Sequence, residues 1–151
     1  MTNILGFNKE KEYLLNNFKL NTLNNSIIIS GQKGIGKNIF LSNIIKDFFK
    51  LSITTDNLDH HINLINNKSH PNIKYICRVE DEKTKKLNKF IKISQIKNLN
   101  NFFNESSLYE NLVKIVIIDS ADELNINASN SILKILEEPK NNTFIFLISH
   151  Q

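Results

Sequence analysis

Short apolar runs along this chain alternate with longer stretches in which apolar residues recur every three or four positions. The runs at 27–29, 73–79, 113–118 and 143–149 predict strands. The stretches between them predict helices from 8 to about 20, from 37 to about 50 and from about 56 to 65, with two more beginning near 94 and 127. Strands that alternate with helices indicate an α/β fold around a parallel sheet.

Polar residues mark where several of these helices are expected to begin and end. Asn8, Ser94 and Asn127 are expected to be N-caps, because their side chains accept hydrogen bonds from free backbone N–H groups. Pro139 is expected to end the last helix. At 151 residues the chain is long enough for one well-buried domain and too short for two comfortable ones.

The first strand leads into a glycine-rich loop, Gly31-Gln32-Lys33-Gly34-Ile35-Gly36-Lys37, at the start of a helix. Small residues let backbone N–H groups curl around a phosphate, and lysine adds positive charge. The motif asks next for Ser or Thr, whose hydroxyl ligates Mg²⁺, but this chain has Asn38. The predicted nucleotide-binding residues are Gly31, Gly34, Ile35, Gly36, Lys37 and Asn38. We expect this site to bind nucleotide poorly, or without productive metal.

A second candidate position lies after the most hydrophobic strand, which ends at Asp119. Parallel sheets present ligands at the carboxyl ends of their strands, where nucleotide-hydrolysing enzymes keep an Mg²⁺-holding carboxylate. A helix-capping aspartate is the alternative interpretation. The next position is Ser120, where a hydrolase of the ring-forming class would carry a glutamate to activate water.

Charge and composition narrow the functional classes only a little. The formal charge of +4 is compatible with nucleic-acid binding but is spread along the chain, and Arg78 is the single arginine. The one cysteine, Cys77, excludes a cysteine-cluster zinc site and is expected to be buried. His60 and His61 are expected to be solvated. No apolar run reaches membrane-spanning length and no signal peptide is present, so a reducing cytoplasm is the expected location.

These motifs, together with Ile4-Leu5-Gly6-Phe7, Ile93-Ser94-Gln95-Ile96 and the run 130–139, resemble the delta-prime subunits of bacterial DNA polymerase III clamp loaders. The most specific piece is Leu133-Lys134-Ile135-Leu136-Glu137-Glu138-Pro139. The resemblance extends from end to end. It implies a three-layer αβα P-loop NTPase module of the AAA+, RecA-like type, with a five-stranded parallel sheet. It also implies Walker-B-like roles for Asp119 and Ser120 and a sensor-1-like role for Ser149.

The function implied by the resemblance is that of a stator that does not hydrolyse ATP. Its partners would be the gamma/tau and delta subunits and, indirectly, the sliding clamp and primed DNA. ATP or ADP, with or without Mg²⁺, is the candidate cofactor. Zinc is not expected, because the four cysteines that many members carry are absent.

Residues 1–151 are expected to form a single AAA+ domain truncated at its C-terminus, without the lid and collar domains or the family's arginine finger. Two alternatives stay open. One is an active ATPase, either a gamma/tau-like motor or an unrelated P-loop enzyme, in which Asn38 ligates Mg²⁺. The other is a vestigial, truncated product.

Overall fold

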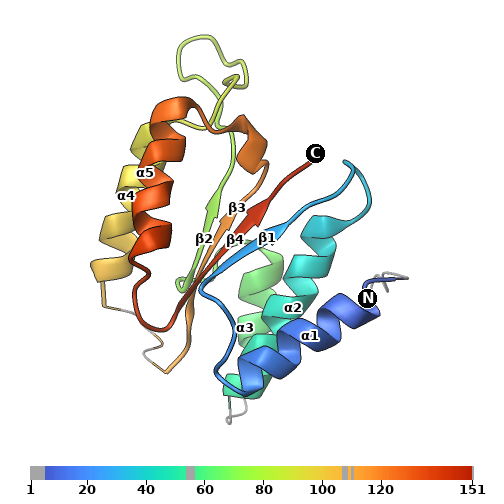
Figure 1. Ribbon diagram of the computed structural model, residues 1–151. Coiled ribbons are helices and arrows are strands. Elements are labelled where there is room, and N and C mark those ends of the chain that lie inside the picture. Colours follow the sequence, from blue (N-terminus) through green and yellow to red (C-terminus); the bar gives the residue numbers. More distant parts are fainter. Residues whose placement is uncertain (1–5, 54–56, 107–108, 110, 151) are drawn as a thin grey trace.

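The computed structural model describes residues 6–53, 57–106, 109 and 111–150. Within these residues, four strands form one parallel sheet in the order β1-β4-β3-β2. Helices α1, α2 and α3 cover one face of the sheet, and α4 and α5 cover the other (Figure 1). The predicted three-layer α/β architecture is confirmed. The strands are β1 (Ser26–Ile29), β2 (Ile73–Ile76), β3 (Lys114–Ile118) and β4 (Thr143–Ile148).

All five predicted helices are present, with small shifts at their ends. A short 3-10 helix, η1, lies between β3 and α5. Asp56, at the expected start of the third helix, lies outside the described residues. The helices are α1 (Asn8–Lys19), α2 (Lys37–Ser52), α3 (Leu58–Asn66), α4 (Ile93–Asn104), η1 (Ala121–Glu123) and α5 (Ile126–Glu137).

The side chains of β3 alternate between two buried cores. Ile115 and Ile117 belong to the core shared with α1, α2 and α3, whereas Val116 and Ile118 belong to the core shared with α4 and α5. Strand β4 follows the same alternation, because consecutive side chains of a strand point to opposite faces. A sheet covered on both faces requires such continuous apolar strands.

The predicted N-caps are wrong in detail. Helix α5 is capped by Asn125, whose Oδ1 accepts the backbone N–H of Ala128 at 2.8 Å, and Asn127 lies inside the helix. Ser94 also lies inside its helix, α4. Asn8 is the first helical residue of α1 rather than its cap. Each predicted cap lies one or two residues too late, and the actual caps of α1 and α4, Phe7 and Lys92, are not residues that N-cap preferences favour.

Cys77 is exposed, which contradicts the expected buried thiol. Strand β2 ends one residue earlier, so Cys77 lies beyond the part of the strand that the helices cover. None of the helices in the described part of the chain combines the length and apolar character needed to span a bilayer.

His61 is buried against His70, so the expectation of a solvated residue is wrong for His61 and right only for exposed His60. His61 Nδ1 lies 2.9 Å from His70 Nε2, and the backbone N–H of Asn72 donates to His70 Nδ1 at 3.1 Å. We therefore place the proton of neutral His70 on Nε2, from which it is donated to His61. The ring of Tyr109 packs edge-on against His61.

This pair should make stability depend on pH. Burial lowers the pKa of His70 from 6.5 to about 4, and burial also lowers the pKa of His61. At a pH between about 4 and 6.5, His70 binds a proton in the unfolded chain but not in the folded chain. The free energy of unfolding should therefore fall by about 2 kcal/mol between about pH 7 and about pH 5. Urea unfolding at about pH 7 and about pH 5 measures this change.

The variant His70→Gln should lose most of this pH dependence, whereas His60→Gln, at the exposed neighbour, should keep it. An unchanged slope in His70→Gln would contradict the assignment.

Lys114, the first residue of β3, holds the C-terminal end of α4. Its ammonium group donates to the carbonyl oxygens of Phe102 at 2.6 Å and Glu105 at 2.5 Å, and stands 5.2 Å from the centre of the Phe102 ring. The last carbonyls of a helix have no donor within the helix. Lys114 therefore supplies donors to this end and ties α4 to the sheet.

Replacing Lys114 with Met keeps the apolar stem but removes the donors. We expect Lys114→Met to lower the free energy of unfolding by about 1–3 kcal/mol. Lys74→Met, at an exposed position of β2, is the matched control and should change stability little. Equal urea midpoints for the two variants would show that the contacts of Lys114 do not stabilise the fold.

Candidate nucleotide site

The glycine-rich loop joins β1 to α2 at the carboxyl edge of the sheet. Gly31 and Gly36 have φ angles of 146° and 90°, which disfavour other residues. A Cβ on Gly31 would also lie 2.9 Å from Cδ1 of Ile35. Gly34 has positive φ as well, and Ile35 is exposed. The loop thus has the glycine-dependent shape that the motif predicts.

Lys37, the first residue of α2, is buried with its side chain turned back onto the loop. Its Nζ donates to the carbonyl oxygens of Gly31 at 2.5 Å and Gln32 at 2.7 Å. These two bonds tie the helix start to the beginning of the loop. An ammonium group has three donors, so one of them can still meet a phosphate oxygen.

Asn38 and Asp119 lie together, although they are far apart in the sequence. Asn38 Nδ2 donates to Asp119 Oδ2 at 3.1 Å, so the start of α2 is joined to the end of β3. A cavity of about 190 Å³ lies beside this pair. It is also lined by Ser42, Asn66, Lys68, Tyr75 and Cys77.

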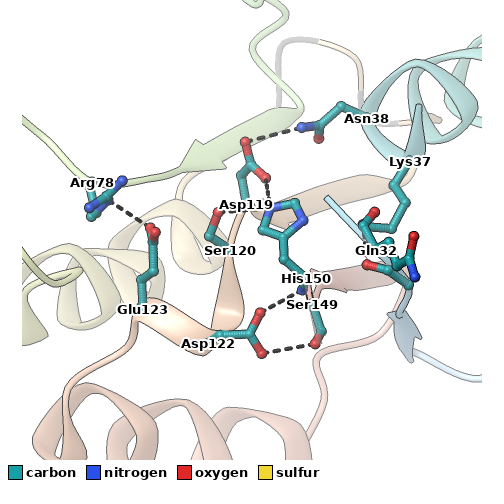
Figure 2. A network of polar contacts seen from close by, with 11 residues as sticks. Gln32, Lys37, Asn38, Arg78, Asp119, Ser120, Asp122, Glu123, Ser149 and His150 are labelled. Atoms are coloured by element: carbon teal, nitrogen blue, oxygen red, sulfur yellow. Dashed lines mark hydrogen bonds and ion pairs between the residues drawn. The ribbon is translucent and has the colours of Figure 1, made fainter. Parts of the chain in front are cut away.

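Ser120 and Ser149 belong to a polar network at the ends of β3 and β4 (Figure 2). Asp122 is its centre: it accepts Ser149 Oγ at 2.8 Å and the backbone N–H of His150 at 2.6 Å. Hydrogen bonding from His150 contributes most to holding the pKa of Asp122 below its usual value. The His150 ring then reaches Ser120, with Nε2 and Oγ 3.0 Å apart.

The structure thus brings every predicted site residue to the carboxyl edge of the sheet, and it adds two that the sequence did not indicate, Asp122 and His150. No local pattern marks either of them, because each acts through a partner 28 or 30 residues away. Arg78, to which no finger role was assigned, pairs with Glu123 at 2.7 Å.

The sequence predicts a site that binds nucleotide poorly or without productive Mg²⁺, and it predicts no zinc site. Across the described ranges, no three His, Cys, Asp or Glu side chains gather into a metal site. The expected absence of zinc stays a prediction. For Mg²⁺ the donor set fits poorly, because Asn38 turns its N–H₂ group, and not its oxygen, toward Asp119. What these residues can do is present backbone amides and one ammonium group to an anion.

This chain is similar to known proteins in sequence and in fold. The family model described as "DNA polymerase III, delta subunit" matches residues 7–151. The chain is 31% identical over 140 residues to DNA polymerase III subunit delta' of Bacillus subtilis (strain 168), and covers 40% of that protein and 91% of itself. It is 34% identical over 141 residues to the subunit delta' of Buchnera aphidicola subsp. Baizongia pistaciae (strain Bp), with 87% of this chain and 40% of the relative covered.

A solved DNA polymerase III gamma subunit-related protein from Thermotoga maritima shares the fold. Its TM-score is 0.63 at 21% identity, over 92% of this chain and 38% of that one. The chain spans 40% of the length of the two delta' relatives. The family match, in contrast, covers almost all of this chain. The chain belongs to the DNA polymerase III delta subunit family.

Proposed function

We propose that this chain is the nucleotide-site region of a delta-prime-type clamp-loader subunit that helps to load the sliding clamp on primed DNA without hydrolysing ATP. The family match over residues 7–151 carries the clamp-loader part of the proposal. The delta' relatives from two bacteria support it. In this role the loop residues and Lys37 hold a nucleotide in a degenerate site, and Ser149 stands at a sensor-1-like position.

We expect no hydrolysis because the site, among the described residues, lacks a suitable carboxylate to activate water. Ser120 occupies the position after Asp119, and a hydroxyl is a far weaker general base than a carboxylate. The nearby carboxylate of Asp122 already accepts hydrogen bonds from Ser149 and His150. Asp119 itself accepts from Asn38. Both carboxylates thus already accept hydrogen bonds from protein groups, which makes each a weaker base toward water.

A phosphate-release assay with ATP and Mg²⁺ tests this proposal. The chain should show no turnover above that of Lys37→Ala. This variant should bind a fluorescent ADP analogue about tenfold more weakly, because it loses the buried ammonium group. Lys33→Ala, at an exposed residue of the same loop, is the control and should bind like the parent chain.

Turnover that depends on Lys37 would replace the stator proposal with the active-ATPase alternative. The observation that favours this alternative is the imidazole of His150, whose Nε2 lies 3.0 Å from Ser120 Oγ at the edge of the site. An imidazole can act as a general base. In that case His150→Gln should abolish the turnover.

A clamp-loader role also predicts assembly. We expect the purified chain to co-elute with gamma/tau and delta subunits in size-exclusion chromatography, and omitting one subunit at a time identifies which of them it contacts. A chain that elutes alone from every mixture would contradict a role in the assembled loader. Rapid cleavage in limited proteolysis would then favour the vestigial product.

A further inference from the structure

The carboxylate of Asp119 is held by protein groups on both sides. Its Oδ2 accepts the amide of Asn38 at 3.1 Å. Its Oδ1 lies 3.6 Å from His150 Nε2 and is buried without a hydrogen-bond partner among the described residues. The two neighbours come from α2 and from the end of β4, so Asp119 lies between them (Figure 2).

His150 is fixed in this position by its own contacts. Its backbone N–H donates to Asp122 Oδ2 at 2.6 Å, and its ring nitrogen meets Ser120 Oγ at 3.0 Å. Ser120 takes a left-handed backbone conformation, with φ of 61°, which is uncommon for a residue with a side chain. Only 22% of the His150 side chain is exposed. The imidazole is therefore a built part of the site and not a loose surface ring.

These groups compete with a divalent cation for Asp119. Mg²⁺ binds oxygen atoms at about 2.0–2.1 Å in near-octahedral geometry. The amide of Asn38 offers hydrogen atoms where a Ser or Thr hydroxyl would offer an oxygen ligand. On the other side, Oδ1 is buried and the His150 ring nitrogen lies 3.6 Å from it, which leaves little space for a hydrated cation. The donor set around Asp119 does not fit Mg²⁺.

We propose that Asn38 and His150 replace the divalent cation at Asp119, so that this site takes a nucleotide di- or triphosphate free of metal. The inference rests on the nucleotide site proposed above. The amide of Asn38, which donates to Asp119 Oδ2, reduces the repulsion between this carboxylate and the phosphates. Lys37 and the loop amides supply the attraction.

The test compares ADP and ATP binding by the full chain in Mg²⁺ and in EDTA, with fluorescent analogues. The parent chain should bind with the same affinity in both. The double variant Asn38→Thr/His150→Asn opens the site and supplies a hydroxyl ligand. Its affinity should rise about tenfold with Mg²⁺. It should also bind Mn²⁺ in the presence of ADP, as seen by electron paramagnetic resonance, whereas the parent chain should not.

Matched controls separate these contacts from general effects of the substitutions. Asn43→Thr makes the same change on α2 without touching Asp119, and His60→Asn changes an exposed histidine. Both should stay indifferent to Mg²⁺. The single variants Asn38→Thr and His150→Asn keep the test available if the double variant fails to fold, which thermal unfolding detects.

Each result has a distinct meaning. Tighter binding of the parent chain in Mg²⁺, or indifference of the folded double and single variants to Mg²⁺, would overturn the replacement of the cation. Failure of ADP and ATP to bind under both conditions would also overturn it, while leaving the proposed clamp-loader role standing if the chain still assembles. Turnover of Mg-ATP by the parent chain would overturn both proposals.

Discussion

Because β3 is buried on both faces, charged side chains can lie only at the ends of this strand. Between Ile115 and Ile118 each side chain enters one of two apolar cores, and a charge there would have to leave water without compensation. The first ionisable side chain therefore comes where the strand leaves the helical layers, at Asp119. Because β1 runs parallel to its neighbours, its loop opens at the same edge.

A partly buried carboxylate at the end of such a strand requires hydrogen-bond donors or opposite charges nearby. In this chain Asn38 donates to one carboxylate oxygen, and the His150 ring lies 3.6 Å from the other without a hydrogen bond to it. The hydrogen bond from Asn38 to Asp119 joins α2 to the end of β3. The hydrogen bonds of His150 to Ser120 and Asp122 join the residue that follows β4 to the same edge and to η1.

The features that could be predicted from the sequence are those that a short segment encodes. Strand and helix alternation, the glycine loop and the aspartate at the end of a strand each lie in one short segment. The cap of α5 was misplaced because Asn125 and Asn127 have the same side chain, and only the backbone path distinguishes them. Contacts between distant segments carry no such signal. The pairs His61–His70 and Asn38–Asp119 span 9 and 81 residues, and neither could be predicted from spacing.

The strand order also bears on how the molecule folds. Within the described residues, β1 pairs with β4 alone, from Ser26 opposite Ile145 to Ile29 opposite Ile148. Pairing of such distant segments is slow, because a long loop must close before the contacts form. During synthesis Ile27, Ile28 and Ile29 emerge early but acquire their strand partner only when β4 leaves the ribosome. Until then Ile27 and Ile29, which the folded chain partly buries against its core, are an exposed apolar segment that a chaperone can bind.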